Sequence, residues 1–276
     1  MDIFSALSEA AQLLSIITDV PQLDAEILLC HILQVDRSYL RAHREQSLSP
    51  LIEQQFAALI QRRAQGEPIA YITGHAEFWS LDLKVTPDTL IPRPETELLV
   101  ECVLREFPQP TGMAIADLGT GSGAIALALA AERPQWEIHA VDSSVKALAV
   151  AQQNAQQLNS KIAFHLGSWC HPLPRQHFNV IVTNPPYIAE SEWAAYAGGL
   201  KFEPPQALLA GPDGLDAIRH IILMAKEYLK SSGRLFLEHG YQQSAAVQNL
   251  LKKAGYQQIR SFQDLAGHKR VTVGSL

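Results

Sequence analysis

Beyond about residue 112, apolar segments with strand patterning alternate with segments of helical periodicity. Such alternation predicts a parallel β-sheet covered by helices on both faces, because parallel strands need long crossover connections. We expect strands near 113–119, 137–142, 162–167, 179–184 and 234–240, with helices near 123–132, 144–158, 215–230 and 243–254. A final pair of strands, near 256–262 and 270–276, has only a short connection, so the last strand is expected to run antiparallel at or near an edge.

The preceding part of the chain has a different pattern. Residues 1–70 show helical periodicity alone, as at Leu23, Ile27 and Leu28, and predict a small helical bundle. Aromatic and alternating residues between Tyr71 and Val85 then indicate a short β-hairpin. We therefore expect three parts: a helical domain over 1–70, a hairpin and linker over 71–93, and an α/β domain over 94–276.

A glycine-rich loop follows the first strand of the α/β domain and precedes an alanine-rich helix. It has the sequence Asp117-Leu118-Gly119-Thr120-Gly121-Ser122-Gly123. Glycines in that context allow a ligand to approach the backbone closely. About twenty residues further on, Asp142 ends the next strand, where a carboxylate can accept hydrogen bonds from both ribose hydroxyls. The two features together predict a nucleoside pocket.

Asp117 indicates which nucleoside this pocket binds. A carboxylate at the strand end, before the first glycine, would repel a pyrophosphate. It can instead orient a zwitterionic amino acid that carries an ammonium and a nearby sulfonium. The sequence therefore favours S-adenosylmethionine over NAD as the cofactor.

A second motif, Asn184-Pro185-Pro186-Tyr187, directly follows the strand expected near 179–184. Ligands of open α/β sheets bind at the carboxyl ends of the strands, so this position suits catalysis. The two prolines fix φ and remove two N–H donors, which leaves Asn184 Oδ1 and nearby backbone carbonyls as acceptors for an NH₂ group.

These acceptors predict methylation of a planar nitrogen. The lone pair of an amide nitrogen is delocalised, and two acceptors that hold its hydrogens would help to localise that lone pair toward a methyl donor. Alignment supplies most of the catalysis, because the methylated nitrogen becomes acidic and can lose its proton afterwards. We expect Asn184, Pro185 and Tyr187 to be catalytic, with Tyr187 as a wall for the planar group.

The glycine loop, Asp142 and the Asn184–Tyr187 motif together resemble the class I methyltransferases that act on planar nitrogen. Three further segments are similar to the release factor glutamine methyltransferases, the protein-(glutamine-N5) methyltransferases, and extend the resemblance over nearly the whole chain. These segments are Phe78-Trp79-Ser80-Leu81, Leu90-Ile91-Pro92-Arg93-Pro94-Glu95-Thr96-Glu97 and Phe202-Glu203-Pro204.

The resemblance implies a fold, a substrate and a set of site residues. The fold is a class I methyltransferase Rossmann-like sheet with an antiparallel last strand, joined through the β-hairpin to a helical domain that docks the substrate. The substrate is the glutamine of the Gly-Gly-Gln motif in class 1 peptide chain release factors of translation termination. The implied cofactor-binding residues are Asp117, Gly119, Thr120, Gly121, Ser122, Gly123, Asp142, Trp169 beside the adenine, and Asn184. The residues implied to hold the glutamine are Asn184, Pro185, Pro186 and Tyr187.

One position departs from the family pattern. Ser168 stands before Trp169 where many relatives have an aspartate that can accept from the adenine amino group. A serine hydroxyl can also accept a hydrogen bond, so we expect cofactor binding to persist.

Charge and composition bear on partners and location. The formal net charge of −6 gives no overall attraction to phosphate backbones, so we expect no direct nucleic-acid binding. Cys30, Cys102 and Cys170 lack metal-binding spacing, and no apolar run reaches membrane-spanning length. We expect no metal, no membrane association and a cytoplasmic location. Two alternative activities use the same chemistry: methylation of a ribosomal-protein glutamine and adenine-N6 methylation of DNA.

Several other residues have less specific patterns. Arg93 is interpreted either as a solvated surface residue or as one that orders the site or the peptide. His239 is expected to serve structural packing or to line the pocket rather than to act in acid–base chemistry, and His165, His171 and His177 lack the local spacing of a zinc site. Glu203 follows Gly198 and Gly199, which indicates either a flexible flap or an exposed loop.

Overall fold

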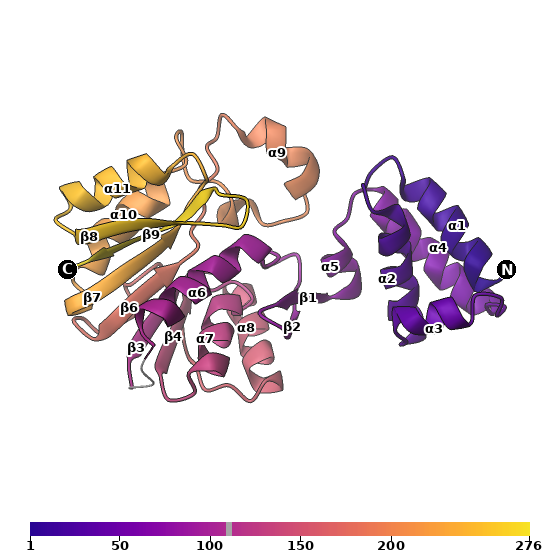
Figure 1. Ribbon diagram of the computed structural model, residues 1–276, viewed down its shortest axis with the longest axis horizontal. Helices are drawn as coiled ribbons and strands as arrows, with labels where there is room; N and C mark the ends of the chain where they lie inside the picture. The colour runs from indigo at the N-terminus through magenta and orange to yellow at the C-terminus, as the bar shows by residue number, and fades with distance from the viewer. Residues whose placement is uncertain (109–111) are drawn as a thin grey trace. The chain divides into compact units, whose positions relative to one another are not determined.

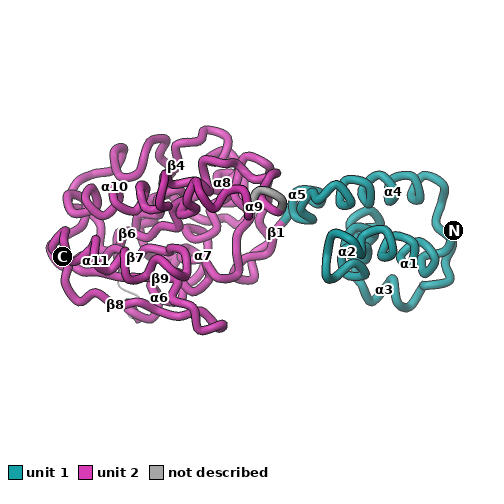
Figure 2. The backbone as a smooth tube through the Cα atoms, turned by 90° about the horizontal axis from the view of Figure 1, so that it is seen from above, with its two compact units in different colours: residues 1–75 teal, residues 76–276 magenta. Residues whose placement is uncertain are grey.

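The computed structural model describes residues 1–108 and 112–276. Figure 1 shows its helices and strands in chain order. The chain divides into two compact units, residues 1–75 and 76–276, which Figure 2 draws in teal and magenta. Each unit has a hydrophobic core of its own, and each is described separately below.

The smaller unit is a helical bundle, as expected. Its helices are α1 (Ile3–Leu14), α2 (Pro21–Leu33), α3 (Arg37–Ala42), α4 (Pro50–Ala64) and α5 (Ile69–Thr73). The Ser49 side chain caps α4 by accepting from the Ile52 backbone N–H, and Pro50 is its first residue. Within the core, Arg63 forms a largely buried ion pair with Asp24 at 2.7 Å, which links α4 to α2.

The β-hairpin is shorter than expected. Residues 71–73 are helical, and Gly74 ends α5 in the left-handed conformation with φ of 81°. Strands β1 (His75–Phe78) and β2 (Leu81–Lys84) follow. Phe78 and Leu83 are buried in a core of the larger unit, and Asn154 Oδ1 accepts from the Lys84 backbone N–H at 2.8 Å. The hairpin is therefore part of the packed structure of residues 76–276.

The larger unit is built on one sheet that has seven strands within residues 112–276. They are β3 (Ala114–Leu118), β4 (Glu137–Asp142), β5 (Ala163–Leu166), β6 (Phe178–Thr183), β7 (Leu229–Glu238), β8 (Gln257–Gln263) and β9 (Lys269–Ser275). Their spatial order is β5-β4-β3-β6-β7-β9-β8. Pairing is parallel from β5 to β7, and β9 runs antiparallel to both β7 and β8. The expected antiparallel last strand is confirmed, and β8 occupies the edge beside it.

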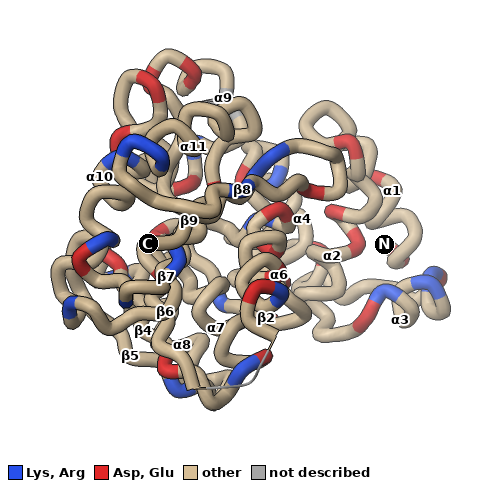
Figure 3. The backbone as a smooth tube through the Cα atoms, turned by 60° about the vertical axis from the view of Figure 1, so that its left-hand side comes forward, with Lys and Arg blue, Asp and Glu red and all other residues tan. Residues whose placement is uncertain are grey.

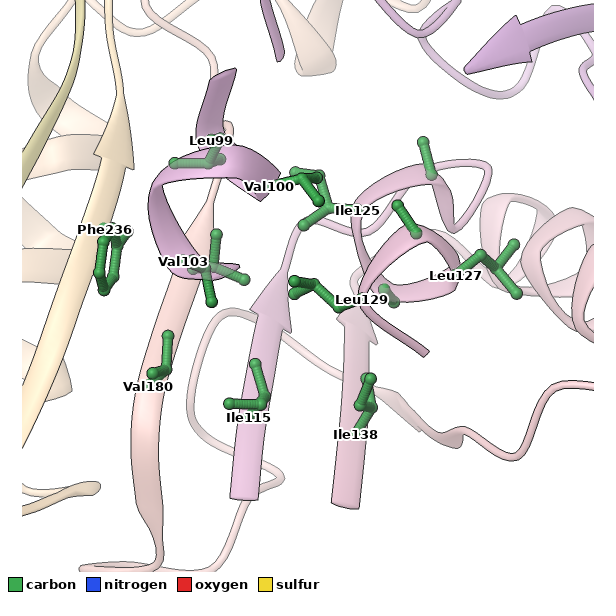
Figure 4. Close-up of a cluster of buried hydrophobic side chains, with 14 of the residues drawn as sticks. Leu99, Val100, Val103, Ile115, Ile125, Leu127, Leu129, Ile138, Val180 and Phe236 are labelled. Atoms are coloured by element: carbon green, nitrogen blue, oxygen red, sulfur yellow. The ribbon is translucent and has the colours of Figure 1, made fainter. Parts of the chain in front are cut away.

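Helices cover both faces of this sheet (Figure 1). One face carries α6 (Glu97–Glu106), α7 (Ala124–Glu132) and α8 (Val145–Gln157), and the other carries α10 (Asp216–Ala225) and α11 (Ser244–Lys253). The connecting segments contain η1 (Pro94–Thr96), α9 (Trp193–Leu200) and η2 (Pro205–Ala207). The pleat of β3 divides its side chains between two cores. Ile115 faces α6 and α7 (Figure 4), whereas Ala116 and Leu118 belong to the core with α10 and α11.

One boundary was wrong by several residues. We expected a helix to residue 230 and a strand from 234, but α10 ends at Ala225 and β7 begins at Leu229. The strand starts early because Leu229 pairs with Phe178, and a register shift then restores pairing between Val180 and Arg234. Tertiary pairing overrides the local helical pattern there.

Candidate active site

Two loops meet at the carboxyl edge of the sheet. Leu118 at the end of β3 pairs with Thr183 at the end of β6, and the Thr183 hydroxyl donates to the Leu118 carbonyl at 2.7 Å. The glycine loop and the Asn184–Tyr187 loop therefore begin beside each other. The chain runs from β3 to β4 on one side, while β6 lies on the other side of β3, so this is the switch point at which open α/β sheets bind ligands.

The glycine loop folds over the end of β4. The backbone N–H groups of Gly119 and Thr120 both donate to the Val141 carbonyl, at 2.8 and 2.9 Å. Gly119, Gly121 and Gly123 have φ values of 71°, 58° and 88°, a region that favours glycine. At Gly123 a Cβ would also lie 3.1 Å from Leu127 Cδ1 and 3.3 Å from Ala151 Cβ, so a side chain there would require these neighbours to shift.

Asp117 lies beneath this loop and is fully buried. Its Oδ2 accepts from the Thr120 hydroxyl at 2.7 Å and from the Ala126 backbone N–H at 3.2 Å. Its Oδ1 has no hydrogen-bond partner among the described residues. Burial raises the pKa of the Asp117 carboxyl to about 7. A buried acceptor without a partner is costly, and a cationic donor at this point would remove that cost.

Two backbone N–H groups fix the Asp142 carboxylate at the end of β4. Its Oδ2 accepts from the Gly121 N–H and its Oδ1 from the Ser144 N–H, each at 2.9 Å. Each carboxylate oxygen has a second lone pair, so each can accept one more hydrogen bond. The arrangement suits a pair of neighbouring hydroxyls.

Trp169 lies against the glycine loop. A Cβ built on Gly119 would be 3.6 Å from Trp169 Cζ3. The segment is tied to β4 because the Gly167 N–H donates to the Asp142 carbonyl at 3.0 Å. Ser168 beside it is exposed. The structure thus brings Trp169 close to the glycine loop and to the end of β4.

The amide of Asn184 has a defined partner. Its Nδ2 donates to the hydroxyl oxygen of Thr96, at 3.0 Å, in the short helix η1. This contact uses the nitrogen and leaves Asn184 Oδ1 as the acceptor. Thr96 itself is 4% exposed. The Asn184 amide is therefore held by Thr96, a residue that the sequence analysis did not select.

Glu238 is a second residue that sequence reasoning missed. It follows Leu237, the partner of Thr183 across β6 and β7, so it lies beside Asn184 at the same edge. Burial raises the pKa of its carboxyl to about 7, an effect that hydrogen bonding from the Thr96 and Tyr187 hydroxyls partly offsets. Its Oε2 has no partner within the described residues. An available signal was its position as a carboxylate ending a strand, the same signal that identified Asp142.

Two segments that are distant in sequence contact the Tyr187 end of the motif. The Tyr187 carbonyl accepts from Gln243 Nε2 at 3.0 Å, and the Gln243 Oε1 accepts from the Gly240 N–H at 2.9 Å. Gly214, with φ of 72°, approaches so closely that a Cβ would lie 2.3 Å from the Tyr187 carbonyl oxygen. Burial raises the pKa of the Tyr187 hydroxyl, which therefore stays protonated.

Glu203 and Arg93 form an ion pair. Glu203 is 3% exposed, and its other oxygen accepts from the Ile91 N–H at 3.2 Å. The interpretation of Glu203 as part of an exposed loop was wrong, since a buried carboxylate needs this pairing. Arg93 is correspondingly a partly buried residue that fixes the loop leading to Thr96.

His239 is held by two hydrogen bonds within the fold. It is buried, with Nδ1 3.0 Å from the Gly240 carbonyl and Nε2 2.7 Å from the Thr272 hydroxyl. Burial lowers its pKa, so the ring is neutral, donating through Nδ1 and accepting at Nε2.

Comparisons with known proteins place this geometry in a family. A family model described as the PrmC N-terminal domain matches residues 5–74, and one described as the methyltransferase small domain matches residues 94–198. A release factor glutamine methyltransferase of Coxiella burnetii is 48% identical over 99% of this chain and 98% of its own. Those of Salmonella typhimurium and Escherichia coli are 47% identical over 93% of each chain.

The chain belongs to the release factor glutamine methyltransferase family. The predicted family is thereby confirmed, and the protein is a methyltransferase enzyme. Solved structures agree on the fold alone. The catalytic domain of hMettl16, in complex with an RNA hairpin, has a TM-score of 0.57 at 17% identity and covers 79% of this chain and 81% of its own. A methyltransferase from Pyrococcus furiosus has a TM-score of 0.53 at 17% identity, covering 78% of this chain and 98% of its own.

Among the described residues of this release factor glutamine methyltransferase family member, no helix is long and apolar enough to cross a membrane.

Proposed function

We propose that this family member transfers the methyl group of S-adenosylmethionine to the side-chain nitrogen of a glutamine, the one in the Gly-Gly-Gln motif of class 1 peptide chain release factors. The product is N5-methylglutamine. The observation that carries the proposal is the Thr96-held Asn184 amide, whose Oδ1 acceptor stands beside the glycine loop. The substrate class comes from the name shared by the close full-length relatives.

The residues around the glycine loop fit S-adenosylmethionine. The free Oδ1 of Asp117 suits the cofactor's ammonium, and Asp142 has one spare lone pair on each oxygen for the ribose hydroxyls. The backbone of Gly119 to Gly123 gives close approach without side chains, and Trp169 offers an apolar surface to the adenine. The bound cofactor supplies an electrophilic methyl group on a sulfonium.

The Asn184 loop is proposed to hold the glutamine. Asn184 Oδ1 and the Pro185 backbone carbonyl accept the two amide hydrogens, which turns the nitrogen lone pair toward the methyl carbon. Pro186 keeps the loop rigid, and Tyr187 forms a wall against the planar amide. As the nitrogen–carbon bond forms and the carbon–sulfur bond breaks, the nitrogen becomes acidic and its extra proton leaves to solvent.

Two alternatives share this chemistry. Methylation of a ribosomal-protein glutamine differs only in which partner the helical unit over residues 1–75 docks. Adenine-N6 methylation of DNA is less well supported, because the net charge is −6 and acidic and basic positions are interspersed along the chain (Figure 3). A cytoplasmic location follows from the proposed substrate, which acts in translation.

Methyl transfer from labelled cofactor tests the proposal. The purified protein is incubated with methyl-labelled S-adenosylmethionine and a class 1 release factor, or with the same factor carrying alanine in place of the Gly-Gly-Gln glutamine. The label is mapped by mass spectrometry. We expect label on the unaltered factor alone and its loss with Asn184→Ala. Label on a ribosomal protein or DNA instead would overturn the substrate.

A further inference from the structure

We propose that Glu238 is a positioning residue that fixes the orientation of the Asn184 amide through the hydroxyl of Thr96. The inference rests on the proposed function, in which Asn184 Oδ1 accepts a hydrogen of the substrate amide. It adds two residues, one from β7 and one from η1, to the part of the site that is proposed to hold the substrate amide.

The backbone brings the three residues together. Thr183 pairs with Leu237, so Asn184 and Glu238 are the next residues on adjacent parallel strands. Thr96 reaches the same point from η1, where its hydroxyl oxygen lies 3.0 Å from Asn184 Nδ2. Glu238 is 1% exposed, and hydrogen bonding from Thr96 lowers its pKa against the effect of burial.

The orientation follows from counting protons. A threonine hydroxyl has one proton, and the carboxylate of Glu238 can only accept once it is ionised, which it is above its pKa of about 7. Thr96 therefore directs its proton to Glu238 and its lone pairs to Asn184, which must present Nδ2. Asn184 Oδ1 is then turned away from Thr96. If Thr96 instead donated to Asn184 Oδ1, the amide would turn over and present NH₂ to the NH₂ of the substrate.

Other groups near Glu238 do not replace Thr96 in this role. Arg270 lowers the pKa of the Glu238 carboxyl and Glu95 raises it, both through charge alone, while Tyr187 lowers it as Thr96 does but has no hydrogen bond to Asn184 among the described residues. The neighbouring His239 has both ring nitrogens engaged elsewhere. Thr96 is thus the link between the buried carboxylate and the amide of Asn184.

Four variants test the link: Glu238→Gln, Thr96→Val, Thr96→Ser and the double variant of Glu238→Gln with Thr96→Val. Glutamine can donate to Thr96 and reverse the proton order, whereas Thr96→Ser keeps the hydroxyl. We expect Glu238→Gln and Thr96→Val each to lower kcat by about 10- to 100-fold, the loss of one or two hydrogen-bond increments. Thr96→Ser should restore most of kcat, and the double variant should lose no more than the worse single variant.

A second readout needs no release factor. With ¹⁵N-asparagine labelling, the side-chain NH₂ signal of Asn184, assigned by its absence in Asn184→Ala, is followed in the cofactor-bound enzyme. We expect Glu238→Gln and Thr96→Val to shift it and Thr96→Ser to leave it in place. An unchanged signal in Glu238→Gln overturns the inference, even if the release factor is not the substrate. Melting temperatures separate misfolding from misorientation.

A separate cluster, at the other end of β4, carries a second inference. The ligand atoms of Glu137, His139 and His177 all lie within 4.8 Å of one another. The Glu137 carboxylate contacts His139 Nε2 at 2.9 Å and His177 Nε2 at 3.2 Å. The geometry points to a site for Zn²⁺ or a similar divalent transition metal, with two imidazoles and one carboxylate as ligands.

A neighbouring histidine supports this arrangement. His165 Nε2 lies 2.9 Å from His139 Nδ1, so it can accept that proton and leave His139 Nε2 free to bind metal. His139 is 8% exposed, and its ring lies parallel to that of His165 and edge-on to that of Phe178. The ligands are forty residues apart in sequence, since β4 carries Glu137 and His139 while His177 precedes β6, and only the sheet brings them together.

Calorimetric titration of the purified protein with ZnCl₂ tests this site. We expect one equivalent to bind to the wild type and to His171→Gln, an exposed histidine outside the cluster, and binding to be lost in His139→Gln and His177→Gln. Equal binding by the wild type and the two cluster variants, or no binding at all, would overturn the assignment. The measurement does not depend on methyl transfer.

Discussion

Asp117 and Glu238 are two buried carboxyls at the same edge of the sheet, on strands that flank β6. Burial raises the pKa of each to about 7, and each has one oxygen without a partner among the described residues. They differ in what holds them. Asp117 is held by Thr120 and Ala126, both within nine residues of it. Glu238 interacts with Thr96 and Tyr187, which come from distant segments.

The difference separates the cofactor side of the site from the acceptor side. The cofactor side is a local structure of one strand, one loop and one helix. The acceptor side is assembled from η1, the Asn184–Tyr187 loop, β7 and the Gly214 turn. Changes on one side should therefore leave the other side largely intact, and the following predictions test that separation.

The largest effect is expected at Gly214. Gly214→Ala places a methyl group 2.3 Å from the Tyr187 carbonyl oxygen and must displace the loop that holds the substrate. A misplacement of about 1 Å costs on the order of 10²-fold in rate, so we expect such a fall in kcat with an unchanged Kd for S-adenosylmethionine. Methyl-transfer kinetics and calorimetry measure the two quantities.

Gly267→Ala is the matched control. Gly267 has φ of 82°, similar to the 72° of Gly214, but a Cβ there meets nothing within 4 Å. Both variants have the backbone strain and only Gly214→Ala has the clash. Equal losses of kcat in the two variants would contradict the proposed role of the Gly214 turn.

A smaller effect is expected on the cofactor side as pH changes. With a pKa of about 7, the Asp117 carboxyl loses its charge as pH falls below 7, and its attraction for the cofactor ammonium weakens. We expect the Kd for S-adenosylmethionine to rise on the order of tenfold between pH 7 and pH 5.5. Asp117→Asn should flatten this dependence; a dependence that persists in the variant would assign it to another group.

The smallest effect is expected on stability. The folded pKa values of Asp117 and Glu238 lie above their ordinary values of 3.8 and 4.5. Their contribution to folding is therefore full below about pH 4 and declines as pH rises through about 7. We expect the ligand-free protein to lose several degrees of melting temperature between pH 5 and pH 8, at roughly 2–4 °C per kcal/mol. Calorimetry on Asp117→Asn and Glu238→Gln should show flatter profiles.

Most of the fold could be predicted from the sequence because its signals are local. The alternation of apolar strands and helices gave the sheet, and the short connection before residue 270 gave the antiparallel strand. The errors occur where distant pairing decides, as at Leu229, where pairing with Phe178 begins β7 inside a segment of helical pattern.

The candidate site likewise has a part that local sequence signals predict and a part that depends on distant contacts. Asp117, the glycines and Asp142 follow one another within a strand–loop–helix unit, and their spacing is readable. The Asn184–Tyr187 motif can be recognised in the sequence, but the residues that hold it by hydrogen bonds cannot. Thr96 is 88 residues from Asn184, and Gln243 is 56 residues from Tyr187. Glu238 and Glu203 are buried, although a glutamate is usually a surface residue. Their burial depends on the assembled fold and could not be predicted from the local sequence.

The most direct test of the two-sided site uses two single variants, Asp117→Asn and Glu238→Gln. For each, the S-adenosylmethionine Kd and the single-turnover rate of methyl transfer at saturating cofactor are measured. The account predicts a Kd at least tenfold higher with a nearly unchanged rate for Asp117→Asn. It predicts an unchanged Kd with a rate reduced about 10- to 100-fold for Glu238→Gln. Parallel changes of both quantities in both variants would contradict it.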